Sequence, residues 1–177
     1  MIRQIALPLT AVLALLVLFY VGLGLDSRSL PSPLIDEPAP SFELQSLTDP
    51  ERTLTEQDFI GEVALVNVFA SWCSSCWAEH SNLVELARDG VAIYGLNYRD
   101  QRPDALRYLD RGGNPYRHIV FDPDGDAGMD WGVYATPETF LLDAEGRIRH
   151  KHIGPLDARV IREEFLPMIE QLEAEAS

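Results

Sequence analysis

Apolar and polar positions follow two rhythms along most of the chain, one typical of buried strands and one of helices. Residues 63–70 and 91–98 are apolar almost throughout, as expected for strands buried on both faces of a sheet. Residues 74–88 and 102–111 follow them with helical spacing, and Pro103 stands early in the second segment, where a helix tolerates proline. This part of the chain therefore predicts two strands, each followed by a helix.

The last third of the chain predicts a different arrangement. Residues 117–121 form a short strand candidate, and residues 139–143 and 147–153 are separated by the turn AEG, which predicts a β-hairpin. Residues 156–172 predict a terminal helix that is bent or interrupted near Pro167. Strand–helix–strand order followed by a hairpin and a last helix indicates an α/β fold, with a mixed sheet flanked by helices.

The N-terminal region predicts a transmembrane helix. Residues 5–25 form a run of 21 residues without a charge, and Arg3 precedes it. A helix of this length spans about 30 Å, the thickness of the hydrocarbon core of a bilayer. The positive end favours a cytoplasmic position for residues 1–4 and export of the remaining chain. The alternative is a cleaved signal peptide, for which Gly22 and Gly24 offer small residues near a cleavage site.

Residues 26–40 contain four prolines and predict an extended, semi-rigid tether. Residues 41–177 then form the folded domain. Both interpretations of residues 5–25, anchor or cleaved signal, place this domain outside the cytoplasm.

Composition excludes several classes of protein. The 177 residues include 28 acidic and 14 basic side chains, for a formal net charge of −14. This charge argues against a nucleic-acid binder, which needs a basic surface, and against wide contact with anionic lipid headgroups. The chain has only two cysteines, so it is no disulfide-stapled secreted scaffold.

The two cysteines form a Cys-x-x-Cys pair where a predicted buried strand ends and a helix begins. Cys73 lies at the predicted helix N-terminus, where unpaired amide groups and the helix dipole stabilise a thiolate. Cys76 follows one helical turn later, so the two sulfurs approach bonding distance. The arrangement predicts dithiol–disulfide exchange, with Cys73 as the attacking thiol and Cys76 as the resolving thiol.

Two other interpretations of the pair remain open at this point. An inert disulfide closes too short a loop to remove much chain entropy. A metal site would combine the cysteines with His80, His150 or His152, although a second Cys-x-x-Cys or a His pair at the usual spacing for zinc is absent from the sequence.

Four segments occur in a recognisable order: residues 67–80 (NVFASWCSSCWAEH), 95–100 (GLNYRD), 113–116 (GNPY) and 132–141 (GVYATPETFL). Together they resemble the CcmG/DsbE family of cytochrome c maturation thioredoxins. The resemblance covers roughly residues 37–170 together with the N-terminal anchor.

The resemblance implies a thioredoxin fold facing the periplasm from a single-pass anchor in the bacterial inner membrane. It implies a DsbD- or CcdA-type membrane electron donor, and apocytochrome c or the maturation protein CcmH as electron acceptor. No cofactor or metal beyond the redox-active disulfide of Cys73 and Cys76 is implied. The alternatives are a general exported thioredoxin-like reductase and, in another class, a copper or zinc delivery module.

Five further residues are candidates for a supporting role. Trp72 is expected to shield the disulfide from water, and Thr136 and Pro137 resemble the thioredoxin loop with a cis proline, which would lie beside the sulfurs. Glu79 shares a helix face with Cys76 and is a candidate acceptor for its proton, while Glu138 resembles the acidic residue of the family near the active site. We expect both carboxylates to make the rim of the site acidic.

Two positions depart from related sequences. Asn67 stands where cytosolic thioredoxins carry a buried aspartate, and an amide cannot accept a proton, which strengthens the case for Glu79. The dipeptide Ser74-Ser75 differs from the proline-containing pair common in the family, so no family value of the reduction potential is carried over.

Overall fold

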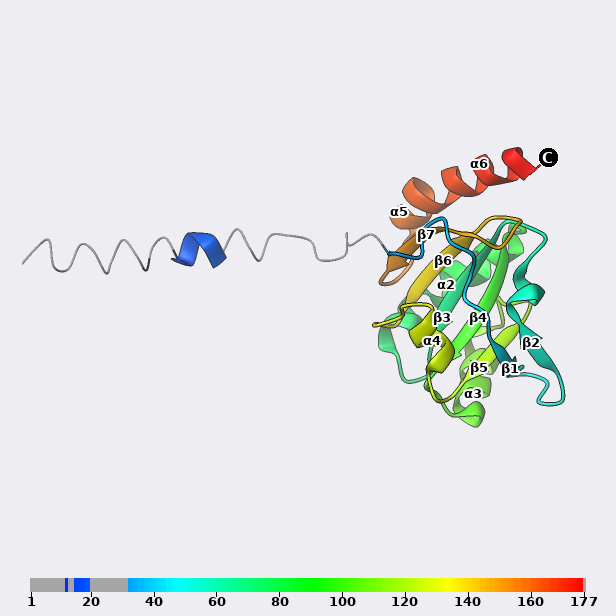
Figure 1. Ribbon diagram of the computed structural model, residues 1–177. Coiled ribbons are helices and arrows are strands. Elements are labelled where there is room, and N and C mark those ends of the chain that lie inside the picture. Colours follow the sequence, from blue (N-terminus) through cyan, green and yellow to red (C-terminus); the bar gives the residue numbers. More distant parts are fainter. Residues whose placement is uncertain (1–11, 13–14, 20–31, 177) are drawn as a thin grey trace, which may run out of the picture. The chain divides into compact units, whose positions relative to one another are not determined.

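The computed structural model describes residues 12, 15–19 and 32–176 (Figure 1). The strands of the described domain are β1 (Glu43–Gln45), β2 (Thr53–Thr55), β3 (Ala64–Phe69), β4 (Ala92–Tyr98), β5 (Ile119–Asp122), β6 (Glu138–Leu142) and β7 (Ile148–Ile153). The helical elements are η2 (Glu56–Phe59), α2 (Ser74–Arg88), α3 (Arg102–Gly112), α4 (Asp126–Asp130), α5 (Ala158–Val160), η3 (Ile161–Phe165) and α6 (Leu166–Ala176).

A mixed five-stranded sheet organises the domain, in the order β5-β4-β3-β6-β7. The middle strand β3 pairs in parallel with β4 and antiparallel with β6. This register places Asn67 between Gly95 and Thr139, in the centre of the sheet. The predicted mixed α/β sheet is confirmed.

The sheet is covered on both faces, and β3 and β4 are therefore buried along their whole length. Leu65, Phe69 and Ile93 pack in one apolar cluster with side chains from α2, α3 and the C-terminal helix. Val66 and Leu96 point to the opposite face and pack with residues from the N-terminal segment, η2 and α4. Continuous apolar runs in the sequence therefore correspond to strands with two buried faces, as predicted.

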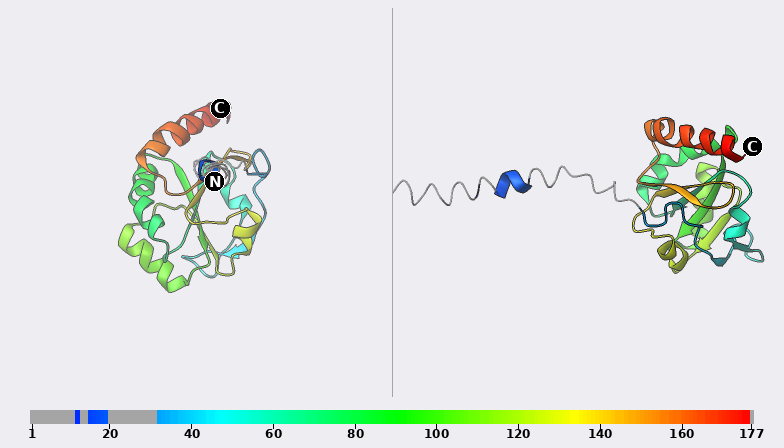
Figure 2. Two further views of the ribbon diagram at one scale, coloured as in Figure 1. Left: turned by 90° about the vertical axis from the view of Figure 1, so that its left-hand side faces the viewer. Right: turned by 45° about the horizontal axis from the view of Figure 1, so that its top comes forward.

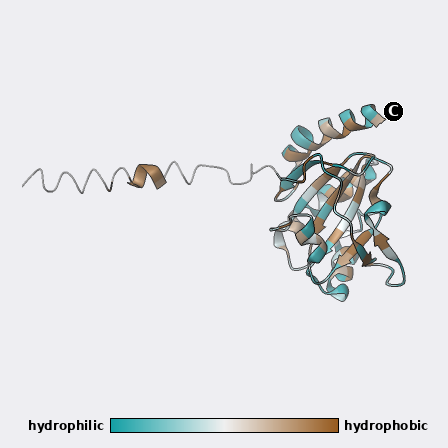
Figure 3. Ribbon diagram, viewed as in Figure 1, coloured by the Kyte–Doolittle hydropathy of each residue, from teal (hydrophilic) through white to brown (hydrophobic). Residues whose placement is uncertain are grey.

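The C-terminal helix lies along the outside of the domain, in red in Figures 1 and 2. Figure 3 shows hydrophilic and hydrophobic residues mixed along α6, and Ile169 and Leu172 are its buried members. The continuous helical segment of α5, η3 and α6 begins after Asp157, whose side chain accepts hydrogen bonds from the first backbone N–H groups of α5. The interruption predicted near Pro167 is confirmed as the π-helical η3, because proline cannot donate the regular helical hydrogen bond.

Several short elements were absent from the sequence prediction. β1 and β2 pair with each other antiparallel, and each has three residues, too few for an alternating pattern to be recognised. The turn after β5 leads directly into the five-residue helix α4.

The described part of the predicted tether, residues 26–40, belongs to the folded domain. Leu34 packs against the core, and Pro38 forms an isolated β-bridge with Arg147. The compact unit accordingly begins at Ser32. The tether prediction is therefore corrected from this residue on, because apolar side chains between the prolines have a core surface on which to pack.

Within the part of the chain that the structure describes, no helix is long and apolar enough to span a membrane. Residues 1–4, which the sequence predicts to be cytoplasmic, and most of the predicted anchor, residues 5–25, lie outside the described residues.

Candidate functional site

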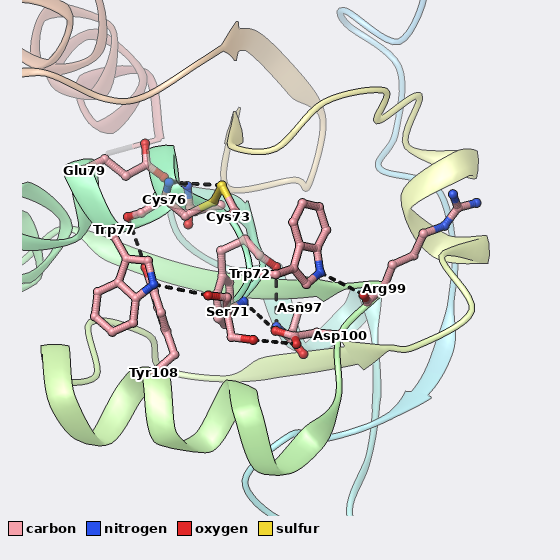
Figure 4. The surroundings of a disulfide bond; sticks show 12 residues. Ser71, Trp72, Cys73, Cys76, Trp77, Glu79, Asn97, Arg99, Asp100 and Tyr108 are labelled. Atoms are coloured by element: carbon pink, nitrogen blue, oxygen red, sulfur yellow. Dashed lines mark hydrogen bonds between the residues drawn. A yellow bond between two sulfur atoms is a disulfide. The ribbon is translucent and has the colours of Figure 1, made fainter.

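Cys73 and Cys76 form a disulfide at the N-terminus of α2 (Figure 4). Cys73 is the N-cap residue of the helix, and its sulfur accepts a hydrogen bond from the backbone N–H of Cys76 over 3.1 Å. A sulfur at this position receives the amide groups that a helix N-terminus leaves unpaired, which stabilises the thiolate after reduction. The structure thus places Cys73 where the sequence predicted the reactive thiol.

The two cysteines differ in their access to solvent. Cys73 is 5% exposed and Cys76 is fully buried at 0%. Cys73 is therefore the more accessible of the two cysteines to a partner disulfide. This difference fits the predicted assignment of attacking and resolving thiols.

Two exposed tryptophans flank the disulfide. Trp72 is 59% exposed and donates its indole N–H to the carbonyl of Arg99 over 3.0 Å. Trp77 is 40% exposed and donates to the carbonyl of Ser71 over 3.2 Å. These bonds fix both rings, although large parts of their apolar faces stay open to solvent.

A hollow of about 320 Å³ lies next to these rings. Trp72 and Trp77 line one part of it, and Tyr108, Arg107 and Arg111 of α3 line another. Asp104, which pairs with Arg107, lines the hollow as well, so the hollow combines aromatic surface with charged side chains of both signs. It is a candidate contact surface for a redox partner.

A buried hydrogen-bond network lies behind the disulfide. Asn67 donates from Nδ2 to Oε1 of Glu79 over 2.9 Å and to the hydroxyl of Thr139 over 3.0 Å. The hydroxyl of Tyr116 donates to Oδ1 of Asn67 over 2.8 Å. The backbone N–H of Leu156 donates to the other carboxylate oxygen of Glu79 over 2.7 Å. The carboxyl group of Glu79 thereby joins α2 to strand β3 and to the segment that precedes α5.

Burial raises the pKa of Glu79 from 4.5 to about 7, although the hydrogen bonds from Leu156 and Asn67 act in the opposite direction. A carboxyl group with such a pKa takes up and releases a proton near neutral pH. Glu79 lies three residues after Cys76 on α2, and both are buried. The arrangement makes Glu79 a candidate proton acceptor for the Cys76 thiol.

Tyr108 was absent from the sequence prediction of the site. Its hydroxyl donates to the carbonyl of Cys76 over 3.1 Å, and its ring packs edge-on against Trp77. Burial and the nearby charge of Glu79 raise the pKa of Tyr108. The side chain thus stays a neutral donor that holds the first turn of α2 against α3.

The peptide bond between Thr136 and Pro137 is cis, as the sequence predicted. Pro137 is buried, and its carbonyl accepts a hydrogen bond from the N–H of Gly154 over 2.9 Å. This contact ties the loop to the segment that follows β7.

Glu138 follows this loop and is fully buried. Its Oε1 accepts hydrogen bonds from the N–H groups of Tyr134 and Ala135, and its Oε2 lies 2.8 Å from Nζ of Lys151. Glu79 is buried as well. The expected acidic rim is therefore wrong, because both carboxylates point into the protein, where donors hold them.

Asp100 is a further buried carboxylate, one that sequence reasoning missed. It accepts hydrogen bonds from the N–H and hydroxyl of Ser71 over 2.6 and 2.7 Å, and from the amide of Asn97 over 3.0 Å (Figure 4). It also accepts from the N–H of Gln101 over 2.8 Å. Asp100 therefore fixes the loop that precedes Cys73. Its place two residues after a buried strand was the available signal.

The histidines do not join the cysteines. His80 lies 2.8 Å from the carbonyl of Gly113 through Nε2. Among the described residues, the group of His, Cys, Asp and Glu side chains whose possible ligand atoms converge is His150, His152 and Glu164. The metal interpretation of the Cys pair therefore gains no ligand from the described residues.

Comparison with known proteins identifies the family. Residues 35–165 match the Redoxin family. A protein named "Thiol:disulfide interchange protein DsbE" from Allochromatium vinosum is 53% identical over 168 residues, which cover 94% of this chain and 93% of the relative. A protein of the same name from Pseudomonas aeruginosa is 48% identical over 166 residues, covering 94% and 92%.

The chain belongs to the DsbE family. The resemblance to CcmG/DsbE proteins is thereby confirmed, and the protein is a thiol-disulfide oxidoreductase. A secreted thiol-disulfide isomerase from Corynebacterium glutamicum has a similar structure, with a TM-score of 0.65 at 22% identity over 75% of this chain and 85% of that one. A putative DsbE from Chlorobium tepidum gives a TM-score of 0.60 at 24% identity, covering 77% and 95%. These structures show the thioredoxin-like fold of the DsbE domain.

Proposed function

We propose that the protein reduces the disulfide of apocytochrome c, directly or through CcmH, before haem is attached. The observation that carries this proposal is the buried carboxyl group of Glu79 behind Cys76, in a chain related over most of its length to DsbE proteins. Reduction of a substrate requires the buried Cys76 to lose a proton, and Glu79 offers an acceptor with a pKa of about 7.

The reaction transfers two electrons through one mixed disulfide. The Cys73 thiolate attacks a sulfur of the substrate disulfide, which forms a Cys73–substrate bond and releases the first substrate thiolate. The Cys76 thiol then gives its proton to Glu79 and attacks Cys73. The Cys73–Cys76 disulfide forms, the second substrate sulfur leaves as a thiolate, and the proton held by Glu79 returns to solvent.

The oxidised protein then needs a reductant, for which a DsbD- or CcdA-type membrane protein is the proposed donor. We place the domain in the periplasm, anchored in the bacterial inner membrane by residues 5–25. The uncharged run of 21 residues behind Arg3 supports this placement.

The test compares two disulfide substrates of the reduced full chain in mild detergent. One is an oxidised peptide with the haem-attachment motif Cys-x-x-Cys-His, and the matched control carries the same residues with the cysteines moved apart. We expect reduction of the motif peptide to be faster by about tenfold or more. Equal rates for both peptides would favour a general exported reductase, and no reduction of either would overturn the proposal.

The equilibrium reduction potential is an independent check. Thioredoxin-fold proteins range from about −270 mV for thioredoxin to about −120 mV for a strong oxidant. We expect Cys73–Cys76 to titrate against glutathione at or below roughly −200 mV, where the dithiol donates electrons. A value near the oxidant end would make the protein an acceptor of electrons from thiols.

A further inference from the structure

Three side chains that the redox site does not use converge beneath the C-terminal helix. His150 and His152 are alternate residues of β7, so they lie on one face of this strand, and Glu164 belongs to η3. The rings of both histidines pack edge-on against Phe165. The three side chains are partly buried, and their possible ligand atoms all lie within 4.8 Å of one another.

The two distances from the histidines to Glu164 match the geometry of a tetrahedral metal ion. Nε2 of His150 lies 3.4 Å from Oε2 of Glu164, and Nδ1 of His152 lies 3.3 Å from the same oxygen. Zinc binds nitrogen and carboxylate oxygen at about 2.0–2.2 Å. Two ligands at tetrahedral angles around such an ion are therefore about 3.3–3.6 Å apart. An ion would fit between these atoms with only small movements of the side chains.

The pairing of the strands positions the two rings. His150 stands opposite Leu141 and His152 opposite Thr139. Both β6 residues face the side of the sheet that α2, α3 and the C-terminal helix cover. The imidazoles are therefore directed toward η3, where Glu164 meets them. Glu164 precedes the buried Phe165 in the π-helical turn η3.

We propose that His150, His152 and Glu164 form a binding site for a divalent transition-metal ion, with Zn²⁺ as the ion that fits the ligand set best. Two imidazoles and one carboxylate are the protein ligands of several zinc sites that keep a fourth position open. The partial exposure of the three side chains leaves this position accessible to water or to a small ligand. Binding joins the edge strand β7 to the C-terminal helix and uses neither cysteine.

The test uses the full chain with its disulfide intact, so that the cysteines cannot act as ligands. Zn²⁺ is titrated in competition with a chromogenic chelator, in mild detergent. We expect one equivalent to bind, and His150→Ala, His152→Ala and Glu164→Gln each to weaken binding by about tenfold or more. His118→Ala is the matched control, because His118 stacks on Tyr94 in another part of the domain and should leave the affinity unchanged.

A second measurement needs no variant. The side-chain NMR signals of His150 and His152 should shift on addition of one equivalent of Zn²⁺, while those of His80 and His118 stay in place. The absence of saturable binding would overturn the proposal, as would binding that survives the combined loss of all three ligands. Shifts confined to the other two histidines would also overturn it.

Discussion

Asn67 donates a hydrogen bond to the carboxyl group of Glu79 over 2.9 Å, in the buried space behind the disulfide. Asn67 comes from the middle strand of the sheet, and Glu79 comes from the helix that begins at Cys73. Asn67 supplies a donor and cannot exchange a proton itself. The proton that Cys76 releases therefore passes to Glu79 in the proposed mechanism.

Asn67→Asp should place two carboxyl groups in contact. Two such groups cannot both ionise at this distance, so the pair should hold one proton well above the usual range of a carboxyl pKa. We expect the free energy of unfolding to fall by roughly 3 kcal/mol near pH 8 and by less near pH 5. Urea denaturation of the oxidised protein at both pH values measures this, with the exposed change Gln101→Glu as control. Equal losses in the two variants would argue against a desolvated contact.

Glu79 should make stability depend on pH. Its pKa of about 7 lies above the usual 4.5, so its contribution to stability is complete below pH 4.5 and is lost as pH rises through 7. The shift corresponds to roughly 3 kcal/mol at most. We expect Glu79→Gln to remove this pH-dependent loss, measured by denaturation of both proteins across that range. A constant difference between the proteins reflects altered hydrogen bonding, so parallel curves would contradict the prediction.

Glu79→Gln should also slow one step of the redox reaction. Without the acceptor, Cys76 loses its proton to water, and resolution of the mixed disulfide should slow by about a hundredfold near neutral pH. Attack by Cys73 should be almost unaffected. Rapid-mixing kinetics with acid trapping separates the two steps. Slowing of the first step alone would assign Glu79 to the activation of Cys73.

Asp100→Asn should loosen the loop before Cys73. The carboxylate accepts from both the N–H and the hydroxyl of Ser71, and an amide leaves part of these donors without an acceptor. We expect a loss of about 2 kcal/mol in unfolding free energy and faster amide exchange at Ser71. Asp104→Asn, at an exposed ion pair with Arg107, is the control and should cost little. Unchanged exchange at Ser71 would contradict the role of Asp100.

The elements that the sequence predicted well are those with long, uninterrupted patterns. The helix over Ser74–Arg88 has the predicted bounds, and β3 lies within the predicted residues 63–70. Between residue 41 and β3 the sequence predicted no strand or helix. β1 and β2 depend on pairing with each other, and three residues carry too little pattern to predict a strand.

The residues of the site divide in the same way, into those that a local pattern predicts and those that depend on contacts between distant parts of the chain. Cys73, Cys76 and Pro137 stand in recognisable local motifs, so they could be named from the sequence. Tyr108 contacts Cys76 across 32 positions of the chain, and Asp100 contacts Ser71 across 29. Such partners are set by the packing of α3 and the register of β4, which a single sequence does not display. For the same reason the burial of Glu138 was missed, because its partner lies on a neighbouring strand.

Lys151 and Glu138 form a buried ion pair, and we expect the stability of the fold to depend on both charges together. Nζ of Lys151 lies 2.8 Å from the Glu138 carboxylate, and their side chains are 6% and 0% exposed. Lys151→Met keeps the apolar stem but leaves a buried charge without its partner, which should cost about 3–5 kcal/mol in unfolding free energy. Arg159→Met, at the exposed pair with Glu163, should cost little. Chemical denaturation measures all of these variants.

The double variant Glu138→Gln with Lys151→Met distinguishes the pair from general damage to packing. Removing both charges also removes the desolvation cost, so more than half of the loss should be recovered. The N–H groups of Tyr134 and Ala135 still find an acceptor in the amide oxygen of the new glutamine. If the separate losses of Glu138→Gln and Lys151→Met simply add, Lys151 stabilises the loop before the cis proline through the contacts of its ammonium group with the Tyr134 and Phe140 rings, and its pairing with Glu138 contributes little.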